Sequence, residues 1–124
     1  MNKPKIGTIG WIDLTVPNAD EVKDFYAAVT GWQPEPVSMG DYNDYNMVSK
    51  GESRAGVCHK KGENSGIPSQ WMIYINVADL DKSREPCEAR GGKLLTDIRS
   101  MGAMGRYCFI EDPAGAVCSL FEPQ

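Results

Sequence analysis

Three side chains that could bind or react with a small molecule alternate along one short stretch near the N-terminus. In GWIDLTV (residues 10–16), Trp11, Asp13 and Thr15 alternate with apolar residues. An alternation with a period of two predicts a β-strand whose apolar face packs against a core. The opposite face would present an indole ring, a carboxylate and a hydroxyl, which suits ligand binding or proton transfer.

Two further ionisable residues could take part in chemistry. His59 is the only histidine, and Glu122 lies two residues from the end of the chain. Cys58 points to the other face of the strand that carries His59, so a Cys–His nucleophilic pair is not expected. A histidine can transfer protons near neutral pH or bind a metal, and a carboxylate can do both. The residue types leave open whether these side chains are catalytic or structural.

The elements that must position these residues come from an internal repeat. Shifted by 61 residues, 11–32 (WIDLTVPNADEVKDFYAAVTGW) lies over 72–93 (MIYINVADLDKSREPCEARGGK), and each copy predicts a strand, a helix and a terminal glycine. In the second strand, Ile73, Ile75 and Val77 form the apolar face. The opposite face carries Met72, Tyr74 and Asn76.

The first helix has clear signals at both ends. Asn18 and Glu21 have the spacing of a capping box, and Gly31 predicts its end. Its expected buried stripe consists of Val22, Phe25, Tyr26 and Val29.

The second helix is expected to begin near Ser83, because Pro86 then falls in the first turn, where no amide donor is missed. It should end before Gly91.

Each copy continues into three more strands. Alternation and turn residues predict strands near 33–37, 45–49 and 54–60 in the first copy, and near 93–97, 105–111 and 116–122 in the second. Each copy is therefore a βαβββ module, with module one at about 6–61, a linker at about 62–69 and module two at about 70–123. One such copy buries little core alone, so a single domain of residues 1–124 is expected.

At this point the sequence resembles the vicinal oxygen chelate superfamily, which includes glyoxalase I, bleomycin-resistance proteins and extradiol dioxygenases. The segments FYAAVTGW and GRYCFIEDPAGAVCSLFEP carry the resemblance. It implies an α+β fold in which two βαβββ modules form one curled mixed sheet round a cleft, with the helices outside. It also implies that small molecules bind in the cleft, and that Trp11, Asp13 and Thr15 face it.

The resemblance also indicates where a metal would be held. The four ligand positions of the family's metal enzymes correspond here to Trp11, His59, Met72 and Glu122. Tryptophan only donates an N–H, and methionine is a poor ligand for Zn²⁺, Ni²⁺ or Mg²⁺. We therefore expect no catalytic metal. If a divalent metal binds, His59 and Glu122 would hold it, completed by Asp13, water or substrate.

The remaining candidates line the expected cleft. The catalytic candidates are Asp13, His59 and Glu122. The segment 99–107 could form a mobile flap, and its two methionines could cover an apolar ligand. The expected ligand-binding residues are Trp11, Thr15, Tyr45, Met47, Met72, Tyr74, Asn76, Met101, Met104 and Phe109.

Composition narrows the choice of partner. A net charge of −4 without a basic run argues against nucleic acid, and no apolar stretch is long enough for a membrane span. The resemblance implies a homodimer. Four cysteines without a CxxC pair, and an N-terminus without a signal peptide, favour a reducing cytoplasm.

Three functions remain. The leading expectation is metal-free binding of a small apolar or aromatic molecule, by sequestration or with proton chemistry. The first alternative is a metal-dependent lyase, isomerase or dioxygenase that uses His59 and Glu122. The second alternative is a dimeric interaction module whose cleft is filled by its own side chains.

Overall fold

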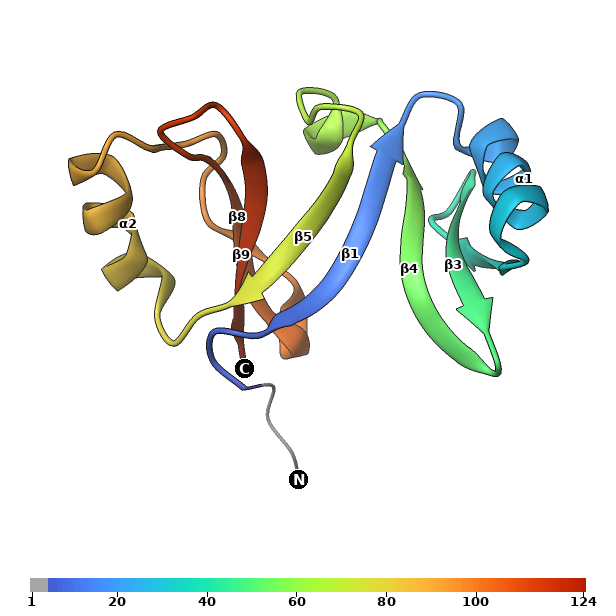
Figure 1. Cartoon of the computed structure of the whole chain (residues 1–124), viewed down its shortest axis with the longest axis horizontal. Coiled ribbons are helices and arrows are strands. Elements are labelled where there is room, and N and C mark those ends of the chain that lie inside the picture. Colours follow the sequence, from blue (N-terminus) through green and yellow to red (C-terminus); the bar gives the residue numbers. More distant parts are fainter. Residues whose placement is uncertain (1–4) are drawn as a thin grey trace. The chain divides into compact units, whose positions relative to one another are not determined.

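The computed structural model describes residues 5–124 and has the expected α+β composition (Figure 1). Nine strands and two α-helices lie within these residues, in an order that confirms two βαβββ-like modules. The chain is divided into two compact units. The 11–71 unit contains most of β1 (Ile9–Val16), α1 (Ala19–Thr30), β2 (Gln33–Ser38), β3 (Asn43–Ser49) and β4 (Glu52–His59). The 72–124 unit, with residues 5–10, contains most of β5 (Trp71–Asn76), α2 (Leu80–Ala89), β6 (Lys93–Leu94), β7 (Arg99–Ser100), β8 (Gly105–Glu111) and β9 (Val117–Pro123).

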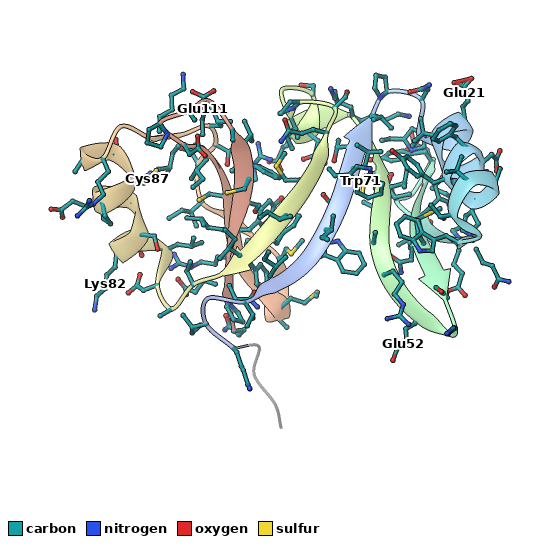
Figure 2. All side chains as sticks on the ribbon, viewed as in Figure 1. Glu21, Glu52, Trp71, Lys82, Cys87 and Glu111 are labelled. Carbon is teal, nitrogen blue, oxygen red and sulfur yellow. The ribbon has the colours of Figure 1, made fainter. Side chains whose placement is uncertain are left out.

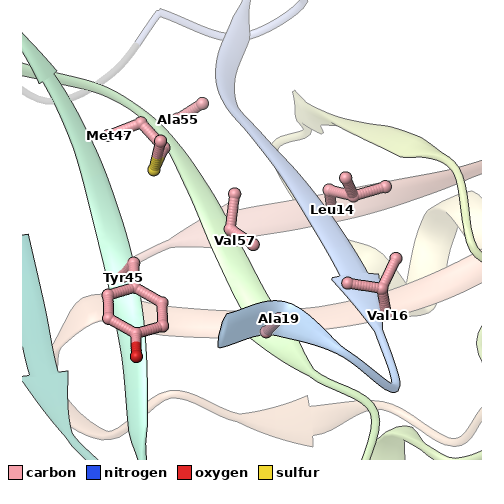
Figure 3. Close-up of a cluster of buried hydrophobic side chains, with 7 residues drawn as sticks. All are labelled: Leu14, Val16, Ala19, Tyr45, Met47, Ala55 and Val57. Carbon is pink, nitrogen blue, oxygen red and sulfur yellow. The ribbon is translucent and has the colours of Figure 1, made fainter. Parts of the chain in front are cut away.

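The sheet of the 11–71 unit is built around one apolar face. Its strands lie in the order β2-β3-β4-β1, with β1 parallel to β4 and the other pairs antiparallel. Figure 3 shows the buried cluster on the face that packs against α1, here called the helix face. Its members are Leu14, Val16, Ala19, Tyr45, Met47, Ala55 and Val57. The opposite face of the sheet is called the helix-free face.

Helix α1 packs on a narrower stripe than the sequence predicts. Val22 and Tyr26 pack against the core, but Phe25 is 58% exposed and Val29 is 65% exposed. The buried stripe is therefore Ala19, Val22 and Tyr26, at spacings of three and four residues.

The expected capping box at the start of α1 does not form. The amide Nδ2 of Asn18 donates to Oε1 of Glu21 at 2.8 Å, and the Asn18 side chain makes no cap bond to the backbone. The two side chains therefore satisfy each other rather than the helix N–H groups.

A cluster of aromatic side chains packs on the helix face of the 11–71 unit. Trp71, which is labelled in Figure 2, donates from its indole Nε1 to Oη of Tyr26 at 3.0 Å, and the ring of Trp32 lies 6.0 Å from that of Trp71. These edge-to-face contacts join α1, the start of β2 and the start of β5.

The 72–124 unit repeats the plan, with strand order β5-β9-β8-β6 and β7 beside β8. The expected strand at 93–97 is split into the two short strands β6 and β7. Asn76 fastens the N-terminal segment to this unit. Its backbone N–H donates to the carbonyl of Thr8 at 2.8 Å, and its Nδ2 donates to the Thr8 hydroxyl at 3.2 Å.

Helix α2 begins at Leu80, three residues before the expected start. Oδ1 of Asp79 accepts hydrogen bonds from the backbone N–H groups of Asp81 and Lys82, so Asp79 is the N-cap. Pro86 consequently lies inside the helix. The cap offsets only part of the cost of a proline inside a helix, since it contributes about 1 kcal/mol against about 3 kcal/mol. No helix within residues 5–124 is long and apolar enough to cross a bilayer.

Candidate functional site

The helix-free face of the 11–71 unit brings together the residues that the first strand was expected to present. In the parallel register, Asp13 lies beside Gly56 and Thr15 beside Cys58. Trp11 and Asp13 are half-buried, and Thr15 is buried. A Cβ at Gly56 would lie 3.1 Å from Cβ of Asp13 and 3.4 Å from Cζ2 of Trp11. The indole ring therefore lies against the backbone of β4.

Cys58, on the same face, is an unreactive thiol. Burial raises its pKa well above the ordinary value, and the negative charges of Asp13 and Asp44 raise it further. A thiol that stays protonated is a poor nucleophile. This face therefore offers an aromatic ring, a carboxylate and a hydroxyl, but no thiolate.

Three of the expected site residues lie on the helix face instead. Tyr45 pairs with Val57, Met47 pairs with Ala55, and His59 lies beside Val16 in the parallel register. Successive strand residues point to opposite faces, so these side chains lie opposite Trp11. Tyr45 and Met47, expected to line the ligand cleft, are core residues beneath α1 and lie on the face opposite to that of Trp11.

His59 is held between two carboxylates on the helix face. Oδ1 of Asp44 accepts the backbone N–H of His59 at 2.8 Å and lies 3.3 Å from its Nδ1. Oδ1 of Asp20 lies 3.6 Å from Nε2. The His59 side chain is 8% exposed, and the ring of Tyr42 packs edge-on against it. These contacts tie β3, β4 and the first turn of α1 together.

A short hydrogen bond between Tyr45 and Asp20 lies in the same cluster, and its effect on the pKa of Tyr45 can be measured. Oη of Tyr45 donates to Oδ1 of Asp20 at 2.5 Å, which raises the pKa of Tyr45 to about 12 and lowers that of Asp20. The variant Asp20→Asn should bring the pKa of Tyr45 back toward 10. A neutral amide does not repel the negative charge of tyrosinate as the carboxylate of Asp20 does. Ultraviolet titration of tyrosinate measures this change.

The neighbouring variant Glu21→Gln is the matched control and should leave the tyrosine titration unchanged. Because the pKa of folded Tyr45 is raised, its contribution to stability is complete below pH 10. It is lost as the pH rises through about 12. A pKa of Tyr45 that stays the same in Asp20→Asn would refute the assigned bond.

In the 72–124 unit the helix face is the face of the sheet that contacts α2 through Glu122 and Arg106. The opposite, helix-free face is aromatic. Tyr74, Tyr107 and Phe109 form a ring cluster whose centroids lie 5.8 to 6.5 Å apart. Ser119 is fully buried and pairs with both Tyr74 and Phe109. Met72 lies on the same face by alternation along β5 and is 1% exposed. Tyr107 and Ser119 were not expected here, although the alternation within 105–111 places Tyr107 beside Phe109.

Two expected site residues of this unit have structural contacts. The Asn76 side chain lies over Gly10 and bonds to Thr8. Glu122 lies on the helix face, where Oε1 accepts from Nη2 of Arg106 at 2.7 Å and from the backbone N–H of Leu80 at 2.8 Å. Arg106 first, and then the Leu80 N–H, lower the pKa of Glu122. Its carboxylate therefore joins β8, β9 and the start of α2.

The segment expected to form a flap is fastened by backbone hydrogen bonds. Met101 N–H donates to the Gly105 carbonyl at 2.8 Å, and Gln124 N–H donates to the Met104 carbonyl at 3.0 Å. The two methionine side chains are 42% and 68% exposed.

The described residues do not fit the metal site of the first alternative, which would use His59 and Glu122. No three histidine, cysteine, aspartate or glutamate side chains of the described chain are placed to hold an ion. His59 and Glu122 each lie on a helix face and are engaged by other groups of their own unit.

Comparisons with known proteins agree on the fold. The family model described as "Glyoxalase/Bleomycin resistance protein/Dioxygenase superfamily" matches residues 8–120. The putative glyoxylase CFP32 of Mycobacterium tuberculosis is 27% identical over 94% of this chain and 44% of its own length. The anthracycline biosynthesis protein DnrV of Streptomyces peucetius is 23% identical, with 94% and 42% covered. The chain thus spans less than half the length of these curated relatives.

Among solved structures, methylmalonyl-CoA epimerase from Mycobacterium tuberculosis superposes with a TM-score of 0.59 at 18% identity, covering 100% of this chain and 93% of that one. A superfamily member from Vibrio splendidus superposes with a TM-score of 0.61 at 13% identity, covering 93% and 99%. At these identities the likeness concerns the fold alone.

Proposed function

Because the chain belongs to the glyoxalase/bleomycin resistance protein/dioxygenase superfamily, we propose that it binds a small apolar or aromatic organic molecule without a catalytic metal. One observation carries the proposal. Four aromatic side chains lie on the helix-free faces, Trp11 in one unit and Tyr74, Tyr107 and Phe109 in the other, and of these Tyr74 and Phe109 are buried. The ionisable candidates His59 and Glu122 lie on the helix faces, where they bond to their own unit.

The placement of His59 and Glu122 on the helix faces also limits which residues could be catalytic. Of the three catalytic candidates, Asp13 alone lies on a helix-free face, half-buried and beside Trp11. Metal-independent proton chemistry would therefore fall to Asp13, with sequestration as the function if no reaction occurs. A curated relative is named a putative glyoxylase, and a solved structure of the same fold is a methylmalonyl-CoA epimerase; these names do not decide between sequestration and catalysis in this chain.

The metal-dependent alternative lacks support from the side chains. Recruiting His59 or Glu122 to a metal would break the bonds that hold β3, β4, β8, β9 and the starts of both helices. The homodimer and the cytoplasmic location stay predictions. The four cysteines are free thiols, which supports a reducing compartment.

Titration with 2-ethylnaphthalene, an uncharged aromatic probe, followed by ligand-detected NMR tests the proposal. Replacement of Trp11 by alanine should weaken binding about tenfold, because the ring contributes both apolar area and stacking. Phe25→Ala is the matched control, since that ring is exposed on α1, and it should bind like the wild type.

Metal content is measured on the same samples, purified without chelator. Failure to bind the probe, or equal binding by the Trp11→Ala variant, would refute the proposed site. A stoichiometric metal whose removal abolishes binding would favour the alternative.

A further inference from the structure

Among the described residues, Trp11 is the one tryptophan placed on a helix-free face, and no acceptor of these residues binds its N–H group. Within residues 5–124 the indole Nε1 makes no hydrogen bond. Trp71, by contrast, donates from Nε1 to Tyr26 on the helix face, and Trp32 packs beside that pair. An indole N–H is a donor only, and it usually finds a partner where it is desolvated. Binding of an apolar molecule over the half-buried Trp11 would desolvate this group.

Gly56 determines where that donor lies. A Cβ at position 56 would be 3.6 Å from Nε1 and 3.4 Å from Cζ2 of Trp11, and 3.1 Å from Cβ of Asp13. The backbone of Gly56 is not in the left-handed region, so conformation does not require glycine there. The space favours glycine, because a Cβ would lie tightly against Cβ of Asp13 and already in contact with the indole ring, so that a side chain larger than alanine would displace the ring.

We propose that Gly56 positions Trp11 as a hydrogen-bond donor, and that the ligand is a planar apolar molecule with an uncharged acceptor oxygen, such as an aryl ketone. This inference rests on the proposed function and specifies its ligand. Asp13 lies beside the ring on the same face, and its negative charge disfavours an anionic acceptor. A carbonyl oxygen accepts from the indole N–H without that repulsion.

Two matched probes separate the hydrogen bond from apolar binding. 2-Acetylnaphthalene and 2-ethylnaphthalene have similar shapes, and only the first has an acceptor oxygen. The wild type should bind the acetyl probe about fivefold more tightly, the value of one net hydrogen bond. In ¹H–¹⁵N spectra, the acetyl probe should move the Trp11 indole N–H signal downfield and leave the Trp71 signal in place.

The variant Trp11→Phe keeps a ring but removes the donor. It should still bind 2-ethylnaphthalene and should lose the preference for the acetyl probe. Gly56→Leu should lose the preference as well, because a side chain longer than a methyl group displaces the indole from its place against β4. Gly66→Leu is the control, since nothing lies within 4 Å of its Cβ position, and it should keep the preference.

The outcomes distinguish the two proposals. Equal binding of both probes by the wild type overturns this inference and leaves the proposed function standing. Binding of neither probe overturns both. A preference that survives in Trp11→Phe shows that another group is the donor. The Trp11→Phe result decides the matter even if Gly56→Leu fails to fold.

Discussion

Of all glycine-to-alanine substitutions in this chain, Gly105→Ala is expected to lower the free energy of unfolding most. Gly105 has a φ of 141°, and its Cβ would lie 2.1 Å from the carbonyl oxygen of Glu122. The obstacle is backbone of β9, which pairs with β8 along its whole length and cannot turn away as a side chain could. Backbone strain and overpacking together should cost about 4 kcal/mol or more. Thermal unfolding should then occur roughly 15 °C lower than in the wild type.

The nearby Gly102 provides the control for this prediction. It also has a positive φ, of 62°, but nothing lies within 4 Å of its Cβ position. Gly102→Ala should therefore show the conformational cost alone, about 1 kcal/mol. Equal losses of stability in the two variants, measured by urea unfolding, would show that the contact with Glu122 is unimportant.

The sequence predicts the elements better than it predicts their contacts. The period-two alternation in 105–111 coincides with β8, and the 61-residue repeat gives both modules in the correct order. These signals are local. The start of α2 depends on a distant acceptor as well, because Glu122 binds the Leu80 N–H from a strand 42 residues away. The space requirements of Gly56 and Gly105 arise from other strands and leave no local signal.

The errors about the site have a common cause. His59 and Glu122 were placed by the ligand positions that the resemblance implies, not by the alternation of their own strands. In β4, Ala55 and Val57 are buried beneath α1, and His59 has the same parity. In β9, Leu120 has the same parity as Glu122 and pairs with the buried Cys108. A shift of one residue reverses every side chain of a strand. The alternation of β4 and β9 themselves places both residues on the helix faces.

Loss of the Glu122 side chain is expected to destabilise the 72–124 unit rather than to remove a catalyst. Glu122→Ala takes the acceptor from Nη2 of Arg106 and from the backbone N–H of Leu80 at the start of α2. Breaking hydrogen bonds to a charged group should cost about 2–3 kcal/mol. Urea unfolding at neutral pH measures the loss, and binding of 2-ethylnaphthalene to the folded variant should stay near the wild-type value.

Asp81 offers a control on the same guanidinium. Its carboxylate lies 3.3 Å from Nη2 of Arg106 but is 66% exposed, so Asp81→Ala should change the free energy of unfolding by only about 0.5 kcal/mol. Similar losses in the two variants would mean that the burial and the helix contact of Glu122 add nothing.

The pH dependence of stability provides a second, independent test of the contacts of Glu122 with Arg106 and the Leu80 N–H. Arg106 and the Leu80 N–H lower the pKa of folded Glu122 below its ordinary 4.5. A lowered pKa contributes stability that is present above 4.5 and is lost as the pH falls through the folded value. The difference in stability between the wild type and Glu122→Gln should therefore be full at pH 7 and should shrink below about pH 4. If Glu122→Gln instead kept full stability at pH 7 but lost the probe, Glu122 would belong to the ligand site after all.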